Sequence, residues 1–229
     1  NAKYTKKTEY NRETKVYERE LEVTPQMENK RLFLFFEGVN SVADVFVNRK
    51  TVGQHKGGYT AFCFEITNYV TPGKNNLQVW ASNAFRTDVL PIAGDFNVYG
   101  GMHRPCRLIV TEKDCISPLF YASPGVLVHQ NKVDAQQAEL TIETHLSRKS
   151  GTKGLRLKTI IADMMGKIVA ETETDADNDI VKQNVIVQKP TLWNGRENPY
   201  LYTVTTTLLN DEKKIDSQTV QTGLRYFHV

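Results

Sequence analysis

The chain has 229 residues, of which 40% are hydrophobic and 24% are charged. This length and composition are typical of a globular protein with one large or two ordinary domains. The formal net charge of +3 at pH 7 is too small, and the basic residues are too dispersed, to indicate a nucleic-acid-binding surface. No run of 18 apolar residues is present, which argues against a membrane-spanning helix.

The cysteines are odd in number and far apart: Cys63, Cys106 and Cys115. They have no Cys-x-x-Cys spacing, so the sequence indicates neither a zinc site nor a disulfide framework, and a single bridge stays open. We expect Cys63 and Cys106 to behave as small buried hydrophobic residues. No signal peptide is visible. The compartment stays open between periplasmic or secreted and cytoplasmic.

The first half of the chain is predicted to consist of short strands separated by turns. Runs of β-branched and aromatic residues are bounded by Gly, Pro and Asn, and no stretch keeps a 3.6-residue period for more than one or two turns. His55 is assigned to a turn. This pattern indicates a β-sandwich or jelly roll. The predicted strands are 16–23, 31–37, 43–47, 60–66 and 77–81, with turns at 48–50, 57–58 and 72–76.

A polar loop at 94–105 precedes another strand-like run at 106–111. Two adjacent glycines in it allow positive φ and a close approach to a ligand or to another segment. Polar groups on a loop that rigid strands hold are a common way to build a binding site. The polar and aromatic residues of the loop are Asp95, Asn97, Tyr99, His103 and Arg104, around Gly100 and Gly101.

The second half is predicted to form a separate sandwich. Ser-Pro and Pro-Gly pairs mark a boundary region at 117–134, and residues 138–146 then alternate apolar and polar side chains, as a strand with one buried face does. About seven strands in roughly 100 residues are typical of an immunoglobulin-like fold. The further strands are predicted at 155–161, 168–174, 180–187, 200–208 and 215–222.

Five segments, in order, resemble glycoside hydrolase family 2, the family of β-galactosidases, β-glucuronidases and β-mannosidases. The matching strings are FEGVNSVADVFVNRKTVGQHKGGYTAFCFEIT, GDFNVYGGMHRPCRLIV, SPLFYASPGVLV, PTLWNGRENPYLYTV and QTGLRYFHV. The resemblance implies an all-β chain with two domains. These are a sugar-binding jelly-roll or galactose-binding-like domain at 1–117 and an immunoglobulin-like β-sandwich at 118–229.

The resemblance also implies roles for residues of the loop. Asp95 is expected to contact sugar hydroxyls, which suits a carboxylate, and to help to hold a monovalent cation or Mg²⁺ in the full enzyme. Asn97 and Asn11 are weaker substrate-contact candidates. Gly100, Gly101, His103 and Arg104 are structural candidates. Among them, His103 is expected to be a hydrogen-bonded imidazole, and Arg104 to tie the loop to a carboxylate or carbonyl. Tyr99 is expected to pack.

In this family the catalytic pair of glutamates belongs to a following (β/α)₈ barrel, and no alternating strand–helix pattern is present here. An internal pair of Asp95 with Glu37 or Asp44 has little support. The resemblance therefore implies the non-catalytic front part of a β-galactosidase-like retaining glycosidase that is inactive by itself. It has no cofactor of its own, and its partners are its own barrel domain and a β-galactoside or related glycan.

Other interpretations stay open. A stand-alone carbohydrate-binding or adhesion module would carry exposed coplanar aromatic residues on one sheet face. If the chain is a purely structural two-domain scaffold, Asp95→Ala would change nothing in the full enzyme. A β-glucuronidase or β-mannosidase parent and a homo-oligomer are also compatible with the sequence. For Trp193 and Tyr200 we favour a packing role over a sugar platform. The tryptophan-containing opening strands of the family are not seen before Tyr4, which implies an unpaired edge in the first sheet.

Overall fold

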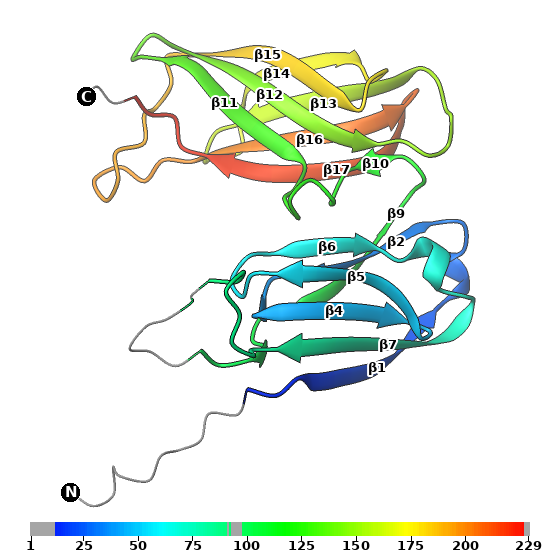
Figure 1. Cartoon of the computed structure of the whole chain (residues 1–229). Coiled ribbons are helices and arrows are strands. Elements are labelled where there is room, and N and C mark those ends of the chain that lie inside the picture. Colours follow the sequence, from blue (N-terminus) through cyan, green and yellow to red (C-terminus); the bar gives the residue numbers. More distant parts are fainter. Residues whose placement is uncertain (1–11, 91, 93–97, 227–229) are drawn as a thin grey trace, which may run out of the picture. The chain divides into compact units, whose positions relative to one another are not determined.

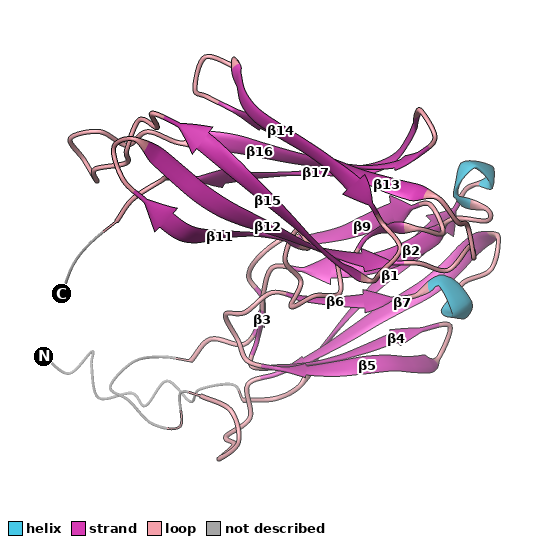
Figure 2. Ribbon diagram, turned by 90° about the horizontal axis from the view of Figure 1, so that it is seen from above, coloured by secondary structure: helices cyan, strands magenta, loops and turns pink. Residues whose placement is uncertain are grey.

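The computed structural model describes residues 12–90, 92 and 98–226. The described chain is built almost wholly of strands, with two short 3₁₀ turns, η2 (Pro25–Met27) and η3 (Thr67–Tyr69) (Figure 2). It divides into two compact units. Unit 1 comprises Asn1–Glu28 and Leu32–Val110, and unit 2 comprises Asn29–Arg31 and Thr111–Val229. No helix in the part that the structure describes is long and apolar enough to cross a membrane.

Unit 1 is a β-sandwich of two main sheets and one small strand pair (Figure 1). One sheet has the order β1-β7-β4-β5, the other has the order β6-β2-β9, and β3 pairs with β8. The strands are β1 (Lys15–Val23), β2 (Arg31–Phe36), β3 (Val39–Asn40), β4 (Val42–Val47), β5 (Lys50–Lys56), β6 (Phe62–Glu65), β7 (Gly73–Ser82), β8 (Gly101–Met102) and β9 (Cys106–Thr111).

The hairpin that joins β4 to β5 has the tight turn that the sequence predicts. Asn48 and Arg49 both adopt positive φ, of 50° and 64°, as the two central residues of a type I′ turn do. The Asn48 amide also donates to Tyr69 O at 2.9 Å and to Asn75 Oδ1 at 2.8 Å. These bonds fix the hairpin end of the β1-β7-β4-β5 sheet.

Unit 2 is a second antiparallel sandwich, the immunoglobulin-like fold that the sequence predicts. In one sheet β12 pairs with β10, β11 and β15, and the other sheet has the order β14-β13-β16-β17. The strands are β10 (Cys115–Ile116), β11 (Val126–Val133), β12 (Gln137–Ser147), β13 (Leu155–Ala162), β14 (Ile168–Asp175), β15 (Ile180–Gln188), β16 (Tyr202–Asn210) and β17 (Lys213–Thr222).

Alternating side chains of β12, β13, β15 and β16 form the core of unit 2, as expected for strands with one wet face. A buried polar link joins the two sheets across this core. Gln183 of β15 accepts from Thr159 Oγ1 of β13 at 2.6 Å and donates to Leu157 O at 2.8 Å. Thr159 also shares a hydrogen bond with Thr206 of β16 at 2.9 Å. Each buried polar atom of this link therefore has a partner.

Several details differ from the sequence predictions. The predicted turn at 72–76 lies largely in β7, which begins at Gly73, and β5 was not predicted as a strand. The units divide between Val110 and Thr111, whereas the sequence placed the boundary after Ser117, because β10 pairs with β12 of unit 2. The region 117–134, read as a boundary, contains the strand β11, which pairs with β12 over most of its length. The proline and glycine residues of this region precede β11 and indicated a linker, so the strand was not predicted from the sequence.

Candidate functional site

The predicted substrate-contact residues Asp95, Asn97 and Asn11 lie outside the described residues. The two ends of the loop that carries Asp95 are described, at 83–90 and 98–104. These two ends fix where the loop leaves and rejoins unit 1.

Two buried asparagines hold the end of the loop that begins at Val98. Asn83, 4% exposed at the end of β7, donates through Nδ2 to Val98 O at 2.8 Å. Asn40, 1% exposed on β3, donates through Nδ2 to Tyr99 O. Two successive carbonyls are thus bound by amides from different strands. These two bonds fix the backbone directly after residue 97, although the Oδ1 atom of Asn40 is buried without a hydrogen-bond partner among the described residues.

The paired glycines are required by close packing on both sides. A Cβ on Gly100 would lie 2.8 Å from Asn83 Cγ, and a Cβ on Gly101 would lie 2.4 Å from the hydroxyl of Tyr17. Gly101 also has a φ of +109°, which side chains with a Cβ rarely adopt. The Tyr17 hydroxyl accepts from Met102 N at 3.4 Å. The glycines therefore let the chain pass closely over β1 and β7.

The residues that follow the glycines lie at the surface. Arg104 donates through Nη1 to Tyr59 O at 3.1 Å, which is the kind of carbonyl contact expected for it. His103 is exposed and its ring tilts against that of Tyr59 at a centroid distance of 5.7 Å. No hydrogen bond of the His103 imidazole involves another described residue. Tyr99 was expected to pack, but the residue is 72% exposed, and its carbonyl is bound by Asn40.

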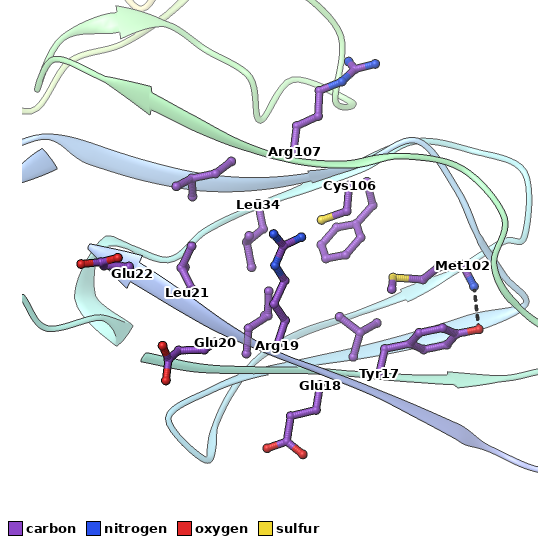
Figure 3. A pocket seen from close by; sticks show the side chains of 14 residues that line it. Tyr17, Glu18, Arg19, Glu20, Leu21, Glu22, Leu34, Met102, Cys106 and Arg107 are labelled. Carbon is purple, nitrogen blue, oxygen red and sulfur yellow. Dashed lines mark hydrogen bonds between the residues drawn. The ribbon is translucent and has the colours of Figure 1, made fainter. Parts of the chain in front are cut away.

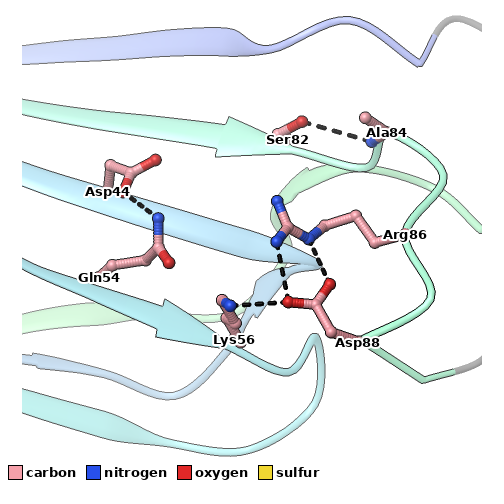
Figure 4. A network of polar contacts seen from close by, with 7 residues as sticks. All are labelled: Asp44, Gln54, Lys56, Ser82, Ala84, Arg86 and Asp88. Atoms are coloured by element: carbon pink, nitrogen blue, oxygen red, sulfur yellow. Dashed lines mark hydrogen bonds and ion pairs between the residues drawn. The ribbon is translucent and has the colours of Figure 1, made fainter.

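A charged network holds the other end of the loop (Figure 4). Arg86 makes a bidentate pair with Asp88, with Nε–Oδ1 and Nη2–Oδ2 distances of 2.7 and 2.8 Å. Lys56 of β5 donates to the same carboxylate at 2.7 Å. The hydrogen bonds from Arg86 and then Lys56 hold the pKa of the Asp88 carboxyl well below its ordinary value. Asp88 therefore stays ionised and ties the loop to β5.

An apolar groove of about 610 Å³ opens between β1 and β9 (Figure 3). Tyr17, Arg19 and Leu21 of β1 point into it, while Glu18 and Glu20 point away. In the part of unit 1 that is described, β1 and β9 each end a sheet. The groove is thus the open side of the sandwich.

Cys106 lines this groove. Cys106 was predicted to be buried, but the residue is exposed at the strand edge. Cys63, also predicted to be buried, is half-buried. Burial of the sulfur nevertheless raises the pKa of the Cys106 thiol to about 11 and that of Cys63 to about 12. Cys115 is the buried cysteine, and all three are free thiols.

Three other residues considered in the sequence analysis make packing contacts in the structure. His55 is not in a turn: it lies in β5, stacks on Phe62 at 4.3 Å, and has its pKa lowered by burial. Trp193 covers Gly223, whose Cβ would lie 2.8 Å from the indole, and lies 5.1 Å from the Arg225 guanidinium. Tyr200 packs on Tyr202 at 5.2 Å and against the core of unit 2.

Metal ligands do not cluster in the described chain: its His, Cys, Asp and Glu residues include no group of three or more that could hold an ion. Glu37 is paired with Arg107, and Asp44 accepts from Gln54 at 2.6 Å. Each of these two carboxylates is therefore held by a hydrogen-bond donor of unit 1.

Comparison with known proteins identifies the family. The model described as "Glycosyl hydrolases family 2, sugar binding domain" matches residues 4–112, and the model "Glycosyl hydrolases family 2" matches residues 125–225. The chain belongs to glycoside hydrolase family 2. Its two units correspond to these two matches in the same order.

Relatives in this family are about three to five times as long as the chain. A β-glucuronidase of Bacteroides fragilis is 44% identical over 227 residues, which are 97% of this chain and 33% of the relative. A β-galactosidase of Thermoanaerobacter pseudethanolicus is 29% identical over 91% of this chain and 28% of the relative. The chain therefore spans about a third of the length of these family 2 relatives.

Solved structures of family 2 proteins have the same fold. A putative β-galactosidase from Bacteroides fragilis superposes with a TM-score of 0.90 at 34% identity, over 94% of this chain and 33% of that one. A Bacteroides uniformis β-glucuronidase superposes with a TM-score of 0.91 at 29% identity, over 96% of this chain and 27% of that one. The family 2 match thus extends through both units.

Proposed function

We propose that this chain is the non-catalytic front part of a family 2 glycosidase that hydrolyses terminal β-glycosides by a retaining mechanism. The observation that carries the proposal is the ordered match of both units to a third of the length of named β-glucuronidases and β-galactosidases. Retaining hydrolysis needs two carboxylates about 5–5.5 Å apart. In the proposed enzyme both carboxylates come from a following barrel domain, which is the chain's principal partner.

The sequence resemblance implies a β-galactoside as the substrate of the parent enzyme. The names of the relatives include both β-glucuronidase and β-galactosidase, so the proposal covers both sugars. The parent protein, extended through its downstream domain, is assayed on p-nitrophenyl β-D-galactoside and β-D-glucuronide. Turnover of either by the long form, and of neither by the 229-residue chain, is the expected result. Turnover by the short chain, or of neither substrate by the long form, would contradict the proposal.

For Asp95 we propose that its carboxylate accepts hydrogen bonds from substrate hydroxyls in the long form. Support comes from the two described ends of its loop: Asn40 and Asn83 bind the backbone from Val98, and Asp88 binds the other end to β5. A loop fixed at both ends loses less conformational entropy when it contacts a ligand. Asn97 and Asn11 are secondary candidates for the same contacts.

In the long form, Asp95→Ala is expected to lower kcat/KM by about 10²–10³-fold, and Asp95→Asn by less, since the amide keeps one acceptor oxygen. Asp211→Ala, an exposed turn residue of unit 2, is the matched control and leaves kcat/KM unchanged. A loss below about threefold for Asp95→Ala would favour the purely structural scaffold.

The described residues hold no group of three or more acidic, His or Cys ligands, so the cation proposed beside Asp95 is not assigned further ligands among them. The cation site is tested by measuring how the KM of the long form depends on the concentrations of Na⁺, K⁺ and Mg²⁺. This dependence is expected to be lost in Asp95→Ala.

A further inference from the structure

The outer face of the β1-β7-β4-β5 sheet carries an exposed aromatic pair. Trp80 of β7 is 42% exposed, although tryptophan usually covers most of its large apolar surface in a folded protein. Phe46 of β4 is half-buried, and its ring lies 5.1 Å from that of Trp80 at an interplanar angle of 45°. The rings are therefore tilted and not coplanar, and the indole of Trp80 offers the larger open surface.

The strand register places polar side chains directly beside Trp80. Val16 and Asp44 are its partners on the two neighbouring strands, and Gln54 is the partner of Asp44 on the next strand. A row of four residues thus crosses the sheet over three strand spacings, about 14 Å. Because residues two apart on a strand share a face, Gln78 and Glu18 lie in the next row of the same face.

These polar groups match hydroxyl groups better than they match an ion. Gln54 Nε2 donates to Asp44 Oδ1 at 2.6 Å (Figure 4), which fixes a planar amide and a carboxylate beside the indole. Between them the two groups can accept and donate hydrogen bonds. Lys56 and Arg86 both pair with Asp88. This leaves Asp44 and Glu18 as carboxylates of this face, and their negative charges disfavour an anionic ligand. The surface therefore favours a neutral polyhydroxylated ligand.

A second copy of the chain fits this surface less well. Complete burial of a tryptophan covers about 150–250 Å², so the exposed 42% of Trp80 offers on the order of 100 Å², and Val16, which is 54% exposed, adds further apolar surface. A stable interface between copies needs about 800 Å² on each side. One open indole with hydrogen-bonding neighbours is enough, by contrast, for a sugar ring, whose apolar C–H face stacks and whose edge carries hydroxyls.

We infer that this sheet face, centred on Trp80 with Asp44 and Gln54, is a carbohydrate-binding surface for a short neutral oligosaccharide. The indole packs against the apolar face of one sugar ring, and the Asp44–Gln54 pair binds hydroxyls of the same or the adjacent ring. The inference does not depend on the proposed glycosidase activity, because all of its residues belong to unit 1 of this chain.

The test is calorimetric titration of the 229-residue chain with β-1,4-galactohexaose and cellohexaose. Saturable binding of at least one hexaose, with a Kd of about 1 mM or tighter, is expected. Trp80→Ala is expected to weaken it at least about tenfold, since exposed tryptophans in binding surfaces carry much of the affinity. Asp44→Ala and Gln54→Ala weaken it severalfold. Trp193→Phe, which changes the packed tryptophan of unit 2, leaves it unchanged.

Three results would overturn the inference. These are no binding of either hexaose at about 5 mM, equal binding by Trp80→Ala and the unaltered chain, and tighter binding of hexagalacturonate than of the neutral sugars. Circular dichroism checks that Trp80→Ala is folded, and Trp80→Phe, with an intermediate affinity expected, provides a conservative variant. If sedimentation velocity shows a dimer that Trp80→Ala abolishes while no hexaose binds, the surface is an interface between copies and the inference fails.

Discussion

Replacing Gly58 with alanine tests whether the side chain of Asn40 lies beside Gly58, in the position from which it binds Tyr99 O at the end of the loop. A Cβ on Gly58 would lie 2.0 Å from Asn40 Oδ1 and 2.7 Å from its Cγ, so the Asn40 side chain must move. Its hydrogen bond to Tyr99 O is then lost, at about 0.5–1.5 kcal/mol. The displacement inside a packed site costs a further ~1–3 kcal/mol. We expect Gly58→Ala to lower the free energy of unfolding by about 2–4 kcal/mol.

The matched background is Asn40→Ala, which removes the atoms that collide. The contact that remains is 3.1 Å, between the new methyl and Asn40 Cβ, and shifts of a few tenths of an ångström relieve it. In this background Gly58→Ala is expected to cost about 1 kcal/mol or less. The difference, a coupling free energy of about 1–3 kcal/mol, is the quantity that the double-mutant cycle measures.

Urea unfolding followed by tryptophan fluorescence provides the assay. Trp80 belongs to unit 1 and Trp193 to unit 2, so all four proteins carry Trp193→Phe and the signal reports unit 1 alone. This choice matters because a two-unit chain need not unfold in a single transition. If Gly58→Ala costs the same in both backgrounds, within about 0.5 kcal/mol, Asn40 does not occupy the space beside Gly58 and the reasoning is refuted.

Three further predictions follow from the same geometry. Gly101→Ala is expected to destabilise unit 1 by about 2–4 kcal/mol in urea unfolding. Adding Tyr17→Phe is expected to restore only part of the lost free energy of unfolding, because the strain of positive φ remains. Complete restoration would show that the contact with the Tyr17 hydroxyl alone matters. Gln183→Leu removes the hydrogen bonds to Thr159 Oγ1 and Leu157 O, while Thr159 keeps its bond to Thr206; it should cost about 1–3 kcal/mol, and a neutral result would mean that the core repacks around leucine. Because burial raises the thiol pKa of Cys106 to about 11 and of Cys63 to about 12, both should react with iodoacetamide slowly at pH 8 and faster as the pH rises toward these values. Since the folded state holds these protons more tightly than the unfolded state, the same shifts make the chain less stable above the unfolded thiol pKa of about 8.5; rapid labelling of both thiols in the folded chain at pH 8 would contradict this.

The all-β character and the two-domain arrangement could be predicted because they depend on local patterns. Strand periodicity in 138–146 and turn residues such as Asn48 act over a few residues, and the structure has a strand and a type I′ turn at these places. The family resemblance depends on short strings in a fixed order, and the comparisons confirm it over both units. β11 was missed because the Pro and Gly residues before it suggested a linker.

The candidate site was only partly predictable. The sequence singled out Gly100 and Gly101 as positions of close approach, and the structure identifies what approaches them, Asn83 and Tyr17. Asn40 and Asn83 lie 58 and 15 residues before Val98, and no local signal marks an asparagine as the partner of a distant carbonyl. Trp80 was part of an ordinary strand pattern, and its exposure depends on which face of β7 the sandwich buries.

The sequence by itself determined that this chain forms two β-sandwiches of glycoside hydrolase family 2, because strand period, turn chemistry and motif order are all written along the chain. Only the tertiary structure decided which side chains meet. Asn40 and Asn83 bind one end of the loop, Asp88 binds the other end to β5, and Trp80 lies beside Asp44 on an open sheet face. The physical reason is that hydrogen bonding and stacking act over a few ångströms in space, whereas strand pairing brings together residues that are far apart in sequence.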